Sequence, residues 1–486
     1  MGCASAARIL AGSLLLCGGC MTVGPDYKPP PMPAPLSWNA GLNAGLTSRP
    51  MDPERLSRWW TVLDDPVLSD LMERARTGNK DLRQAEARLR EARAQRGIAR
   101  ADRFPTVSAN ASAGRTRSSK QAGVGSTTDL FSSGFDASWE LDLFGGKQRT
   151  LEAAEATWQA SQQDLNDVLV SLFAELALTY VDFRSYQARL SITEASLAAQ
   201  NETCEISRWR CEAGLTTQLD VDQALLGLEQ TQAELPLLRT GLEQNRNTLA
   251  VLIGQPPGSL KDLLAGVRAI PVTPAEIAVG LPADLLRRRP DVRRAERRLA
   301  AQTAQIGVAE AARYPDFSLT GSIGLESLDI ANLYKAGART AQAAAKGVWT
   351  LFDAGRIRQN IAVQTALQEQ ALGAYDETVL TALKEVENAL VAYANEQTRR
   401  RSLANAVEAG QRAFDMARSQ YASGLVDFLT VLDTQRSLLS VQESLASSNA
   451  DVTSNLIRLY KSLGGGWATA VPDAMHVNTT HSGEKP

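Results

Sequence analysis

The chain has 486 residues, 44% of them apolar and only 6% aromatic, and its 51 Lys and Arg residues are balanced by 54 Asp and Glu residues to a formal net charge of -3. Such a length allows about three domains or one large repeated architecture, and the lack of a basic excess argues against nucleic acid as a partner. Both histidines, His476 and His481, lie in the polar C-terminal tail, so a folded core has no histidine for a catalytic triad or a metal site, and we expect neither an enzyme nor a bound metal or cofactor.

The N-terminus has the features of an export signal. Arg8 precedes an apolar stretch, residues 9–16, that is too short to span a bilayer. Small residues then lead to Cys20, as at the cleavage site of a bacterial lipoprotein, although Cys17 stands where such sites prefer Leu. We therefore expect a signal peptide at 1–19 and an acylated Cys20 at the start of the mature chain; the alternative is an ordinary signal peptide that is cut nearby. Beyond residue 20 no run of 18 apolar residues occurs, which excludes a protein with several membrane-spanning helices.

The rest of the chain consists of two copies of one unit at an offset of 210 residues. The repeated segments are 81–86 with 291–296, 103–105 with 313–315, 213–215 with 423–425, and 253–254 with 463–464. This repeat predicts an N-terminal segment at 20–78, a first repeat at 79–255, a Pro-rich connector at 256–288, a second repeat at 289–467 and a disordered tail at 468–486.

Two spans without proline, residues 106–235 and 316–471, have room for very long helices, because proline breaks a helix interior. Their apolar residues recur with alternating steps of four and three, as in helices that pack side by side. These positions are Leu169, Phe173, Leu176, Tyr180 and Phe183 in the first copy and Val379, Leu383, Val386, Leu390 and Tyr393 in the second. We expect a helix from about residue 147 to 211, roughly 100 Å long at about 1.5 Å per residue, within a bundle, a coiled coil or a helical wall.

Two cysteines fall within this helical pattern. Cys204 and Cys211 occupy positions where the second copy has Phe414 and Tyr421. Seven residues of helix separate them by roughly 10 Å, which is too far for an unstrained disulfide. We therefore interpret them as small packing residues rather than as a metal or redox pair.

Each copy also contains two stretches in which apolar and polar residues alternate, as in a β-strand with two different faces. The clearest are 135–143 and 317–326, while 107–113 is weaker and 345–351 is a poor case. Stretches of about ten residues are typical of strands in a membrane barrel, with apolar side chains toward lipid and polar ones toward a lumen. A half-buried sheet of a soluble protein would alternate in the same way.

Four strands in lipid leave two edges of unpaired backbone groups, so other copies of the chain must close the sheet. Two copies would give eight strands and an interior filled by side chains, whereas three would give twelve strands and a lumen. Periodicity favours three copies without proving it.

Several motifs together resemble the outer membrane factor family, the TolC-like exit ducts, and in particular the NodT-type efflux lipoproteins. They are the segment 20–27 after the signal, Trp59-Trp60 with Asp65-Pro66 and Leu68, the connector segment 280–291, residues 309–315, and the terminal segment 463–467 with its Gly-Gly-Gly-Trp sequence. The resemblance covers about residues 20 to 467. The connector and terminal motifs are specific to it, whereas the heptads and alternating strands are not.

The resemblance implies a membrane protein of mixed α and β class. A homotrimer would form a 12-stranded β-barrel in the outer membrane, with four strands from each chain, continued by a long periplasmic α-helical barrel and surrounded by a belt made of the connector and the chain ends. It also implies a passive exit duct for small molecules such as drugs, fed by an inner-membrane efflux pump through a periplasmic adaptor. Outer membrane lipid would hold the barrel, assisted by the acyl chain on Cys20. Neither the substrate nor the particular pump and adaptor can be identified from the residues.

Two helix-to-helix turns are the adaptor-docking sites that the resemblance implies. They comprise Gly214, Leu215 and Thr216 in the first copy and Gly424, Leu425 and Val426 in the second. Family members dock the adaptor at such ends through the exposed apolar residue after Gly. Turn geometry alone would also explain the two glycines.

The resemblance further implies a periplasmic gate at Leu429, Asp433 and Arg436. Three copies of Asp433 would form an anionic ring, Arg436 on a neighbouring helix would lock it, and Leu429 would add an apolar constriction. The alternative is that Asp433 and Arg436 merely pair on one helix surface. In the first copy Asp220 and Asp222 lie near the equivalent position without Gln-Arg partners, and whether they join the gate is left open.

Two other classes of protein share part of this pattern. A lipid-anchored periplasmic coiled-coil scaffold or adaptor would have the same signal, heptads and repeat, but it has no use for four alternating strands. A lipid-anchored hydrolase would be exported in the same way, but the chain lacks a histidine in its periodic segments and a nucleophile motif such as G-x-S-x-G.

Overall fold

The computed structural model describes residues 22–31, 35–50, 52–121 and 124–467. Cys20 and both histidines lie outside these ranges. The chain divides into two compact units. We call them the sheet unit, which comprises Met1–Pro31, Glu86–Gln163 and Arg293–Thr378, and the core unit, which comprises Met32–Ala85, Asp164–Val292 and Val379–Pro486.

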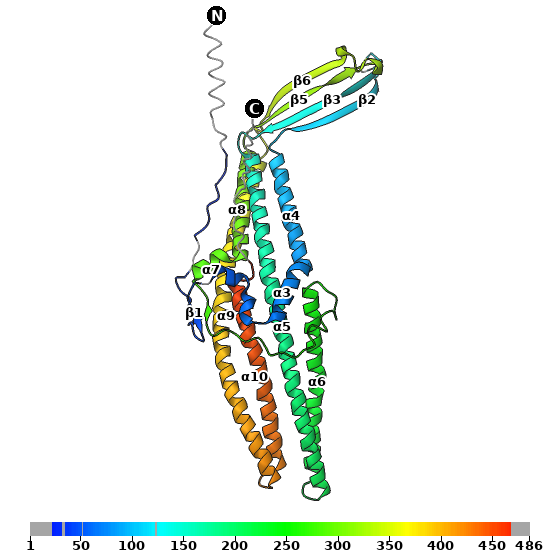
Figure 1. Ribbon diagram of the computed structural model, residues 1–486. Helices are drawn as coiled ribbons and strands as arrows, with labels where there is room; N and C mark the ends of the chain where they lie inside the picture. The colour runs from blue at the N-terminus through cyan, green and yellow to red at the C-terminus, as the bar shows by residue number, and fades with distance from the viewer. Residues whose placement is uncertain (1–21, 32–34, 51, 122–123, 468–486) are drawn as a thin grey trace, which may run out of the picture. The chain divides into compact units, whose positions relative to one another are not determined.

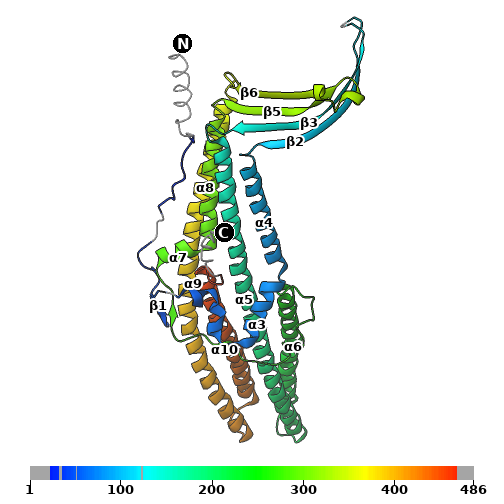
Figure 2. The ribbon, with the colours of Figure 1, turned by 45° about the horizontal axis from the view of Figure 1, so that its top comes forward.

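The sheet unit contains four antiparallel strands in the order β2-β3-β5-β6 (Figures 1 and 2). They are β2 (Thr106–Arg117), β3 (Thr127–Leu141), β5 (Asp316–Ser327) and β6 (Arg339–Val348), with the short turns η2 (Ile330–Asn332) and η3 (Ala336–Ala338) between the last two. β2 with β3 and β5 with β6 are the two expected hairpins, and β3 joins them by pairing with β5 along eleven residues. Helix α4 (Lys80–Ala101) leads into the first hairpin and α8 (Pro290–Ala311) into the second.

The register gives the sheet one apolar and one polar face, because directly opposed residues of neighbouring strands point to the same side. The pairs Trp139 with Leu319 and Phe135 with Ile323 lie on the apolar face. The other face has the pairs Asp136 with Ser322 and Ser138 with Thr320, and the Ser112 and Ser132 hydroxyls meet there at 2.8 Å. The predicted alternation of apolar and polar residues is therefore confirmed for β2, β3 and β5.

The core unit is dominated by two helical hairpins, one from each repeat. They are formed by α5 (Gly146–Glu212) with α6 (Gln218–Leu252) and by α9 (Arg356–Ala422) with α10 (Phe428–Ser462), as Figure 1 shows. The first parts of α5 and α9, up to Gln163 and Thr378, belong to the sheet unit. α5 and α9 each have 67 residues, and α6 and α10 each have 35. The long helix expected from residue 147 to 211 is thus confirmed, and its repeat-related partner has the same length.

Burial of the heptad positions explains why these helices are stable at such a length, since amphipathic packing rather than propensity stabilises helices in water. Leu176, Tyr180, Val386, Leu390 and Tyr393 are fully buried in one apolar cluster. The two cysteines are free, as expected, and Cys204 is buried beside the aromatic residues of the second repeat. Among the described residues, no helix combines the length and the apolar character that crossing a membrane requires.

Short elements from the N-terminal segment and the connector complete the core unit. They are β1 (Leu46–Thr47), α2 (Pro53–Ser57), η1 (Trp59–Leu63), α3 (Pro66–Gly78), β4 (Ile277–Ala278) and α7 (Pro282–Arg288). β1 and β4 pair in parallel, and the Trp38 indole donates a 2.9 Å hydrogen bond to the carbonyl of Gly280. The connector and the N-terminal segment are therefore held together, as the expected belt requires.

Two predicted strand boundaries are wrong. The fourth strand occupies Arg339–Val348 rather than 345–351. The prediction failed because residues 341–345, most of them small, hardly alternate between apolar and polar side chains. The stretch 135–143 also ends earlier, at Leu141, and the Asp142 carboxylate then accepts hydrogen bonds from the backbone amides of Lys147 and Gln148 at the start of α5.

Candidate functional site

The turn between α5 and α6 presents an apolar side chain to solvent. Gly214 has a φ of +72°, a conformation that glycine adopts without strain. The amide of Leu215 donates a 2.8 Å hydrogen bond to the carbonyl of Arg210. The turn is thereby closed, and the Leu215 side chain is 69% exposed. The carboxylate of Asp220 accepts a hydrogen bond from the Thr217 amide at 3.3 Å, which caps the first turn of α6.

The turn between α9 and α10 repeats this geometry. Gly424 has a φ of +74°, and the Leu425 amide donates a 2.9 Å hydrogen bond to the carbonyl of Gln420. The Leu425 side chain is 75% exposed. Asp427 caps α10 by accepting from the Thr430 amide at 3.0 Å. Hydrogen bonds from Thr430 hold the pKa of the Asp427 carboxyl below its usual range. Both predicted adaptor-docking turns therefore expose a leucine on a closed, well-capped loop.

An aromatic cluster packs next to the turn between α9 and α10. Tyr421 and Phe428 pack with ring centroids 5.3 Å apart, and the guanidinium of Arg210 lies 4.6 Å from the Tyr421 ring centroid. Arg210 also donates a 3.3 Å hydrogen bond to the carbonyl of Tyr421. Because Arg210 belongs to α5 and Tyr421 to α9, the two hairpins are tied together close to their ends.

The predicted gate residues lie on one face of α10. Leu429, Asp433 and Arg436 are all exposed, and their spacing of four and three residues places them on the same side of a helix. In the described part of the chain, neither Asp433 nor Arg436 makes an ion pair. The structure thus does not favour the alternative of a simple pair on the helix surface, and the gate stays a prediction.

Arg436 instead approaches the neighbouring helix α6. A Cβ atom built on Gly227 would lie 3.8 Å from its Nη2 atom. In the first repeat, Asp220 is used by the cap of α6, and Asp222 accepts a 3.0 Å hydrogen bond from the Gln218 side chain. The two acidic residues whose role was left open thus have partners within their own helix.

The motif after the predicted signal forms a clamp that the sequence did not reveal. Arg149, at the start of α5, is almost fully buried and donates to the carbonyls of Val23 at 3.0 Å and Gly24 at 3.1 Å. It also donates to the carboxylate of Asp26 at 2.8 Å. Gly24 lies so close to Gly307 of α8 that a Cβ atom there would meet its Cα at 2.4 Å. The segment that follows Cys20 is therefore pinned to the sheet unit.

The motif at 280–291 and the terminal motif have structural roles in the core unit. Arg289 of the first motif is buried, donates to the Ser462 carbonyl at 2.8 Å, and bonds the carboxylates of Asp291 and Glu385. The terminal glycines allow close approach: a Cβ atom on Gly465 would lie 2.8 Å from the ring of Trp59. These residues hold the belt to the long helices.

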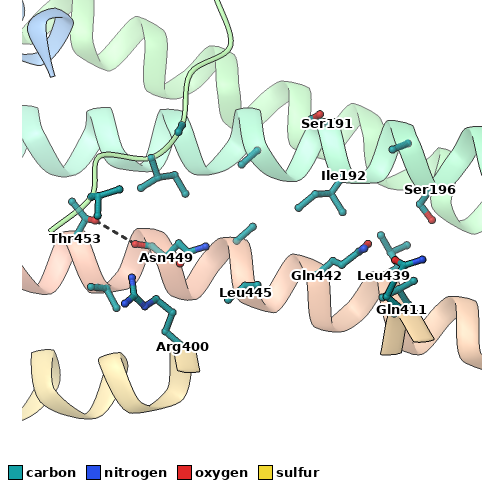
Figure 3. A pocket seen from close by; sticks show the side chains of 18 of the residues that line it. Ser191, Ile192, Ser196, Arg400, Gln411, Leu439, Gln442, Leu445, Asn449 and Thr453 are labelled. Carbon is teal, nitrogen blue, oxygen red and sulfur yellow. Dashed lines mark hydrogen bonds between the residues drawn. The ribbon is translucent and has the colours of Figure 1, made fainter. Parts of the chain in front are cut away.

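A cavity of about 750 Å³ lies between α5 and α10 in the core unit. Apolar and small side chains form much of its lining, and Figure 3 shows Arg400, Gln442 and Asn449 beside it. Among the residues that the structure describes, no group of three or more His, Cys, Asp and Glu side chains could hold a metal ion. The cavity thus brings together no set of residues with obvious chemistry.

Comparison with known proteins agrees with this geometry. Residues 71–255 and 281–465 match the outer membrane efflux protein family. The solvent efflux pump outer membrane protein SrpC of Pseudomonas putida is 33% identical over 464 residues, which cover 94% of this chain and 98% of SrpC. Nodulation protein T of Rhizobium leguminosarum bv. trifolii is 34% identical over 440 residues, or 89% of this chain and 91% of that protein.

The fold comparison leads to the same family. The solved structure of the outer-membrane channel OprN superposes with a TM-score of 0.88 at 37% identity, covering 92% of this chain and 100% of OprN. The fold of this chain is therefore that of an outer membrane channel, with four strands and two long helical hairpins per chain. The chain belongs to the outer membrane efflux protein family.

Proposed function

We propose that the chain is the outer membrane exit duct of a tripartite efflux system. The single observation that carries this proposal is the four-stranded sheet, with one apolar face, one polar face and two outer strands, β2 and β6, that each pair with only one strand among the described residues. Exposed sheet edges are not tolerated in lipid. The two outer edges are suited to pairing with other copies of the same chain.

Three copies would close a twelve-stranded barrel. The polar side chains of Asp136, Ser138 and Thr320 would then face a lumen, and the apolar face would contact lipid. Two copies would give a barrel with an interior filled by side chains, which does not suit a duct. We therefore propose a homotrimer.

The helical hairpins would continue this duct into the periplasm. We propose that Leu215 and Leu425, with their flanking turn residues Gly214, Thr216, Gly424 and Val426, dock a periplasmic adaptor, and that an inner-membrane pump supplies the substrate. Leu429, Asp433 and Arg436 would form the periplasmic gate. Asp433 and Arg436 are suited to this role because both are charged, exposed and without an ion pair in the described chain.

Lipid attachment at Cys20 would assist anchoring. The contacts of Arg149 begin at Val23, three residues after Cys20, so an acyl chain there would be held beside the sheet unit. A trimeric barrel inserts strongly without it, and a single acyl chain adds only modest affinity. Replacement of Cys20 by Ser should therefore lower the yield of assembled protein more than the transport activity of each assembled trimer.

The duct would conduct small molecules without a chemical step. One relative is named for solvent efflux, and we propose small apolar organic compounds, including drugs, as the cargo of this chain. The test is purification in detergent followed by reconstitution into planar bilayers. We expect a trimer that conducts ions; a monomer that is soluble without detergent, or a reconstituted trimer that never conducts, would overturn the proposal.

A further inference from the structure

Two tryptophans at one end of the sheet make the same unusual contact in both repeats. Trp139 donates its indole N–H to the carbonyl of Arg103 at 3.0 Å, and Trp349 donates to the carbonyl of Arg313, also at 3.0 Å. The members of each pair are 36 residues apart, and the second pair lies 210 residues after the first. The chain therefore contains two copies of one structural feature, which we call the Trp-Arg clamp.

Both clamps border the apolar face of the sheet. Trp139 lies opposite Leu319 on that face. Trp349 directly follows β6, in which Gly347 lies opposite Phe317 on that face. The two indoles are 37% and 58% exposed. An amphipathic ring with its N–H bonded to backbone at the edge of an apolar band is typical of a membrane–water interface.

Each tryptophan of a clamp donates its hydrogen bond to the backbone carbonyl of the arginine. The arginine side chain is not used in this bond. Arg103 and Arg313 are exposed, and neither makes an ion pair with any residue that the structure describes. Asp102 is adjacent to Arg103, and Glu310 and Asp316 each lie three residues from Arg313, but among the described residues none of these carboxylates is paired with the arginines. Each clamp thus combines an exposed guanidinium without an ion pair in the described chain and an exposed indole bonded to the backbone of the same arginine.

The opposite end of the apolar band is different. The band on β3 extends from Trp139 to Phe131, about 27 Å along the strand at roughly 3.4 Å per residue. Beyond it, Arg115 is neutralised by Asp129 through hydrogen bonds of 2.5 and 2.7 Å. Arg117 and Arg339, at the same end, are exposed and make no ion pair with any described residue, so free cations occur at both ends of the band. The end next to the helices differs because each free arginine there accepts, through its backbone carbonyl, a hydrogen bond from an exposed indole.

We propose that each Trp-Arg clamp binds the phosphate group of a membrane phospholipid, in the leaflet of the outer membrane that faces the periplasm. The guanidinium would bond the phosphate oxygens, and the indole would lie at the level of the headgroup and glycerol. The inference rests on the proposed membrane-embedded duct and adds to it two lipid-headgroup sites per chain, one from each repeat.

The test is native mass spectrometry of the full protein, released from a neutral detergent and titrated with phosphatidylglycerol. We expect two tightly bound lipids per chain, and a loss of affinity of about fivefold at each site in Arg103→Gln and Arg313→Gln, since a basic residue near a membrane surface contributes about 1 kcal/mol. Arg103→Lys and Arg313→Lys should keep most of the binding. Arg115→Gln, in the same sheet but already paired, is the matched control and should bind like the unaltered chain.

Equal lipid binding by the unaltered chain, the double variant Arg103→Gln with Arg313→Gln and the control would overturn the proposal. If the double variant fails to assemble, the single variants carry the test. Insertion into liposomes and conductance are measured in parallel on the unaltered chain. Normal insertion and conductance with unchanged lipid binding would refute the lipid sites alone, whereas failure to insert or conduct would refute the proposed duct.

Discussion

The Tyr180 hydroxyl donates a 2.7 Å hydrogen bond to the carboxylate of Asp65 and so joins α5 to the start of α3. The other oxygen of Asp65 accepts from the amides of Val67 and Leu68 at 2.8 and 3.0 Å. Arg184 donates to the same tyrosine oxygen at 2.9 and 3.0 Å. Asp65, Tyr180 and Arg184 are all buried, so the N-terminal segment is held to the long helix by a charged network with little access to water.

Replacement of Tyr180 by Phe should destabilise the protein by about 2 to 3 kcal/mol, because a buried carboxylate loses a donor and a buried guanidinium loses one of its acceptors. The thermal unfolding midpoint of the detergent-solubilised protein measures this. Tyr393→Phe is the matched control, since that hydroxyl accepts only from the neutral Gln397 side chain at 2.9 Å and should cost less. Equal losses in the two variants would contradict a special role for the charged network.

The same network predicts a pH dependence in alkali. Burial, followed by the hydrogen bond to Asp65, raises the pKa of Tyr180 above its ordinary value. The pKa of Tyr180 is thus higher in the folded protein than in the unfolded chain. Tyr180 therefore stabilises the fold fully below the pKa of tyrosine in the unfolded chain, about 10, and this contribution is lost as the pH rises through the pKa in the folded protein. The unaltered chain should therefore lose stability above about pH 10, and Tyr180→Phe should lose less over the same range. If the stability of the two proteins falls equally with rising pH, then the pKa of Tyr180 does not differ between the folded and unfolded chains.

Replacement of Arg149 by Gln should release the segment that follows Cys20. The variant loses hydrogen bonds to two carbonyls and one carboxylate. We expect the free energy of local unfolding of this segment to fall by about 2 kcal/mol, which corresponds to roughly 30-fold faster proteolysis within residues 22–31. Gln359→Ala is the control, because Gln359 is the repeat counterpart of Arg149 and is exposed. If both variants resist the protease equally, the clamp does not hold the segment.

The periodic parts of the fold could be predicted from the sequence, and the parts without a period could not. The heptads located α5 to within one residue at each end because a helix of this length repeats its signal many times. β6 was misplaced because Ala341, Ala343, Ala344 and Ala345 do not alternate with polar residues. Pro236 lies inside α6, where local propensity alone would end the helix; the packing of Leu235 and Leu238 in the same turn outweighs it.

The clamp at Arg149 could not be inferred from the repeat. Its contacts join residues more than 120 positions apart, and the second repeat has the exposed Gln359 at the position that corresponds to Arg149. By contrast, the exposure of Leu215 and Leu425 was expected from the family resemblance, and both side chains are exposed. The sequence left two arrangements of Asp433 and Arg436 open, and in the described part of the structure the two side chains form no ion pair with each other.

The double variant Asp433→Ala with Arg436→Ala should raise single-channel conductance, because an anionic ring and its locking arginines would be removed from the proposed gate. Stability should change by less than about 0.5 kcal/mol, since both side chains are exposed and unpaired. The measurement is conductance in planar bilayers at neutral pH. Asp222→Ala, which removes an exposed acid that bonds only within α6, is the control and should conduct like the unaltered chain. An unchanged conductance in the double variant would show that these residues do not form the gate.

Replacement of Leu215 and Leu425 by Ser should weaken adaptor binding without affecting the fold. Burial of a leucine at an interface contributes about 1.5 to 3 kcal/mol, so each change should raise the Kd at least about tenfold. Leu237→Ser is the matched control, because Leu237 is also strongly exposed on a helix of the first hairpin, at 72%, but lies more than four turns from Leu215 along α6. Surface-immobilised adaptor and the detergent-solubilised protein give the Kd. A loss of binding in the control as large as in the turn variants would place the adaptor elsewhere on the helices, because an exposed leucine outside the turns would then contribute as much as one within them.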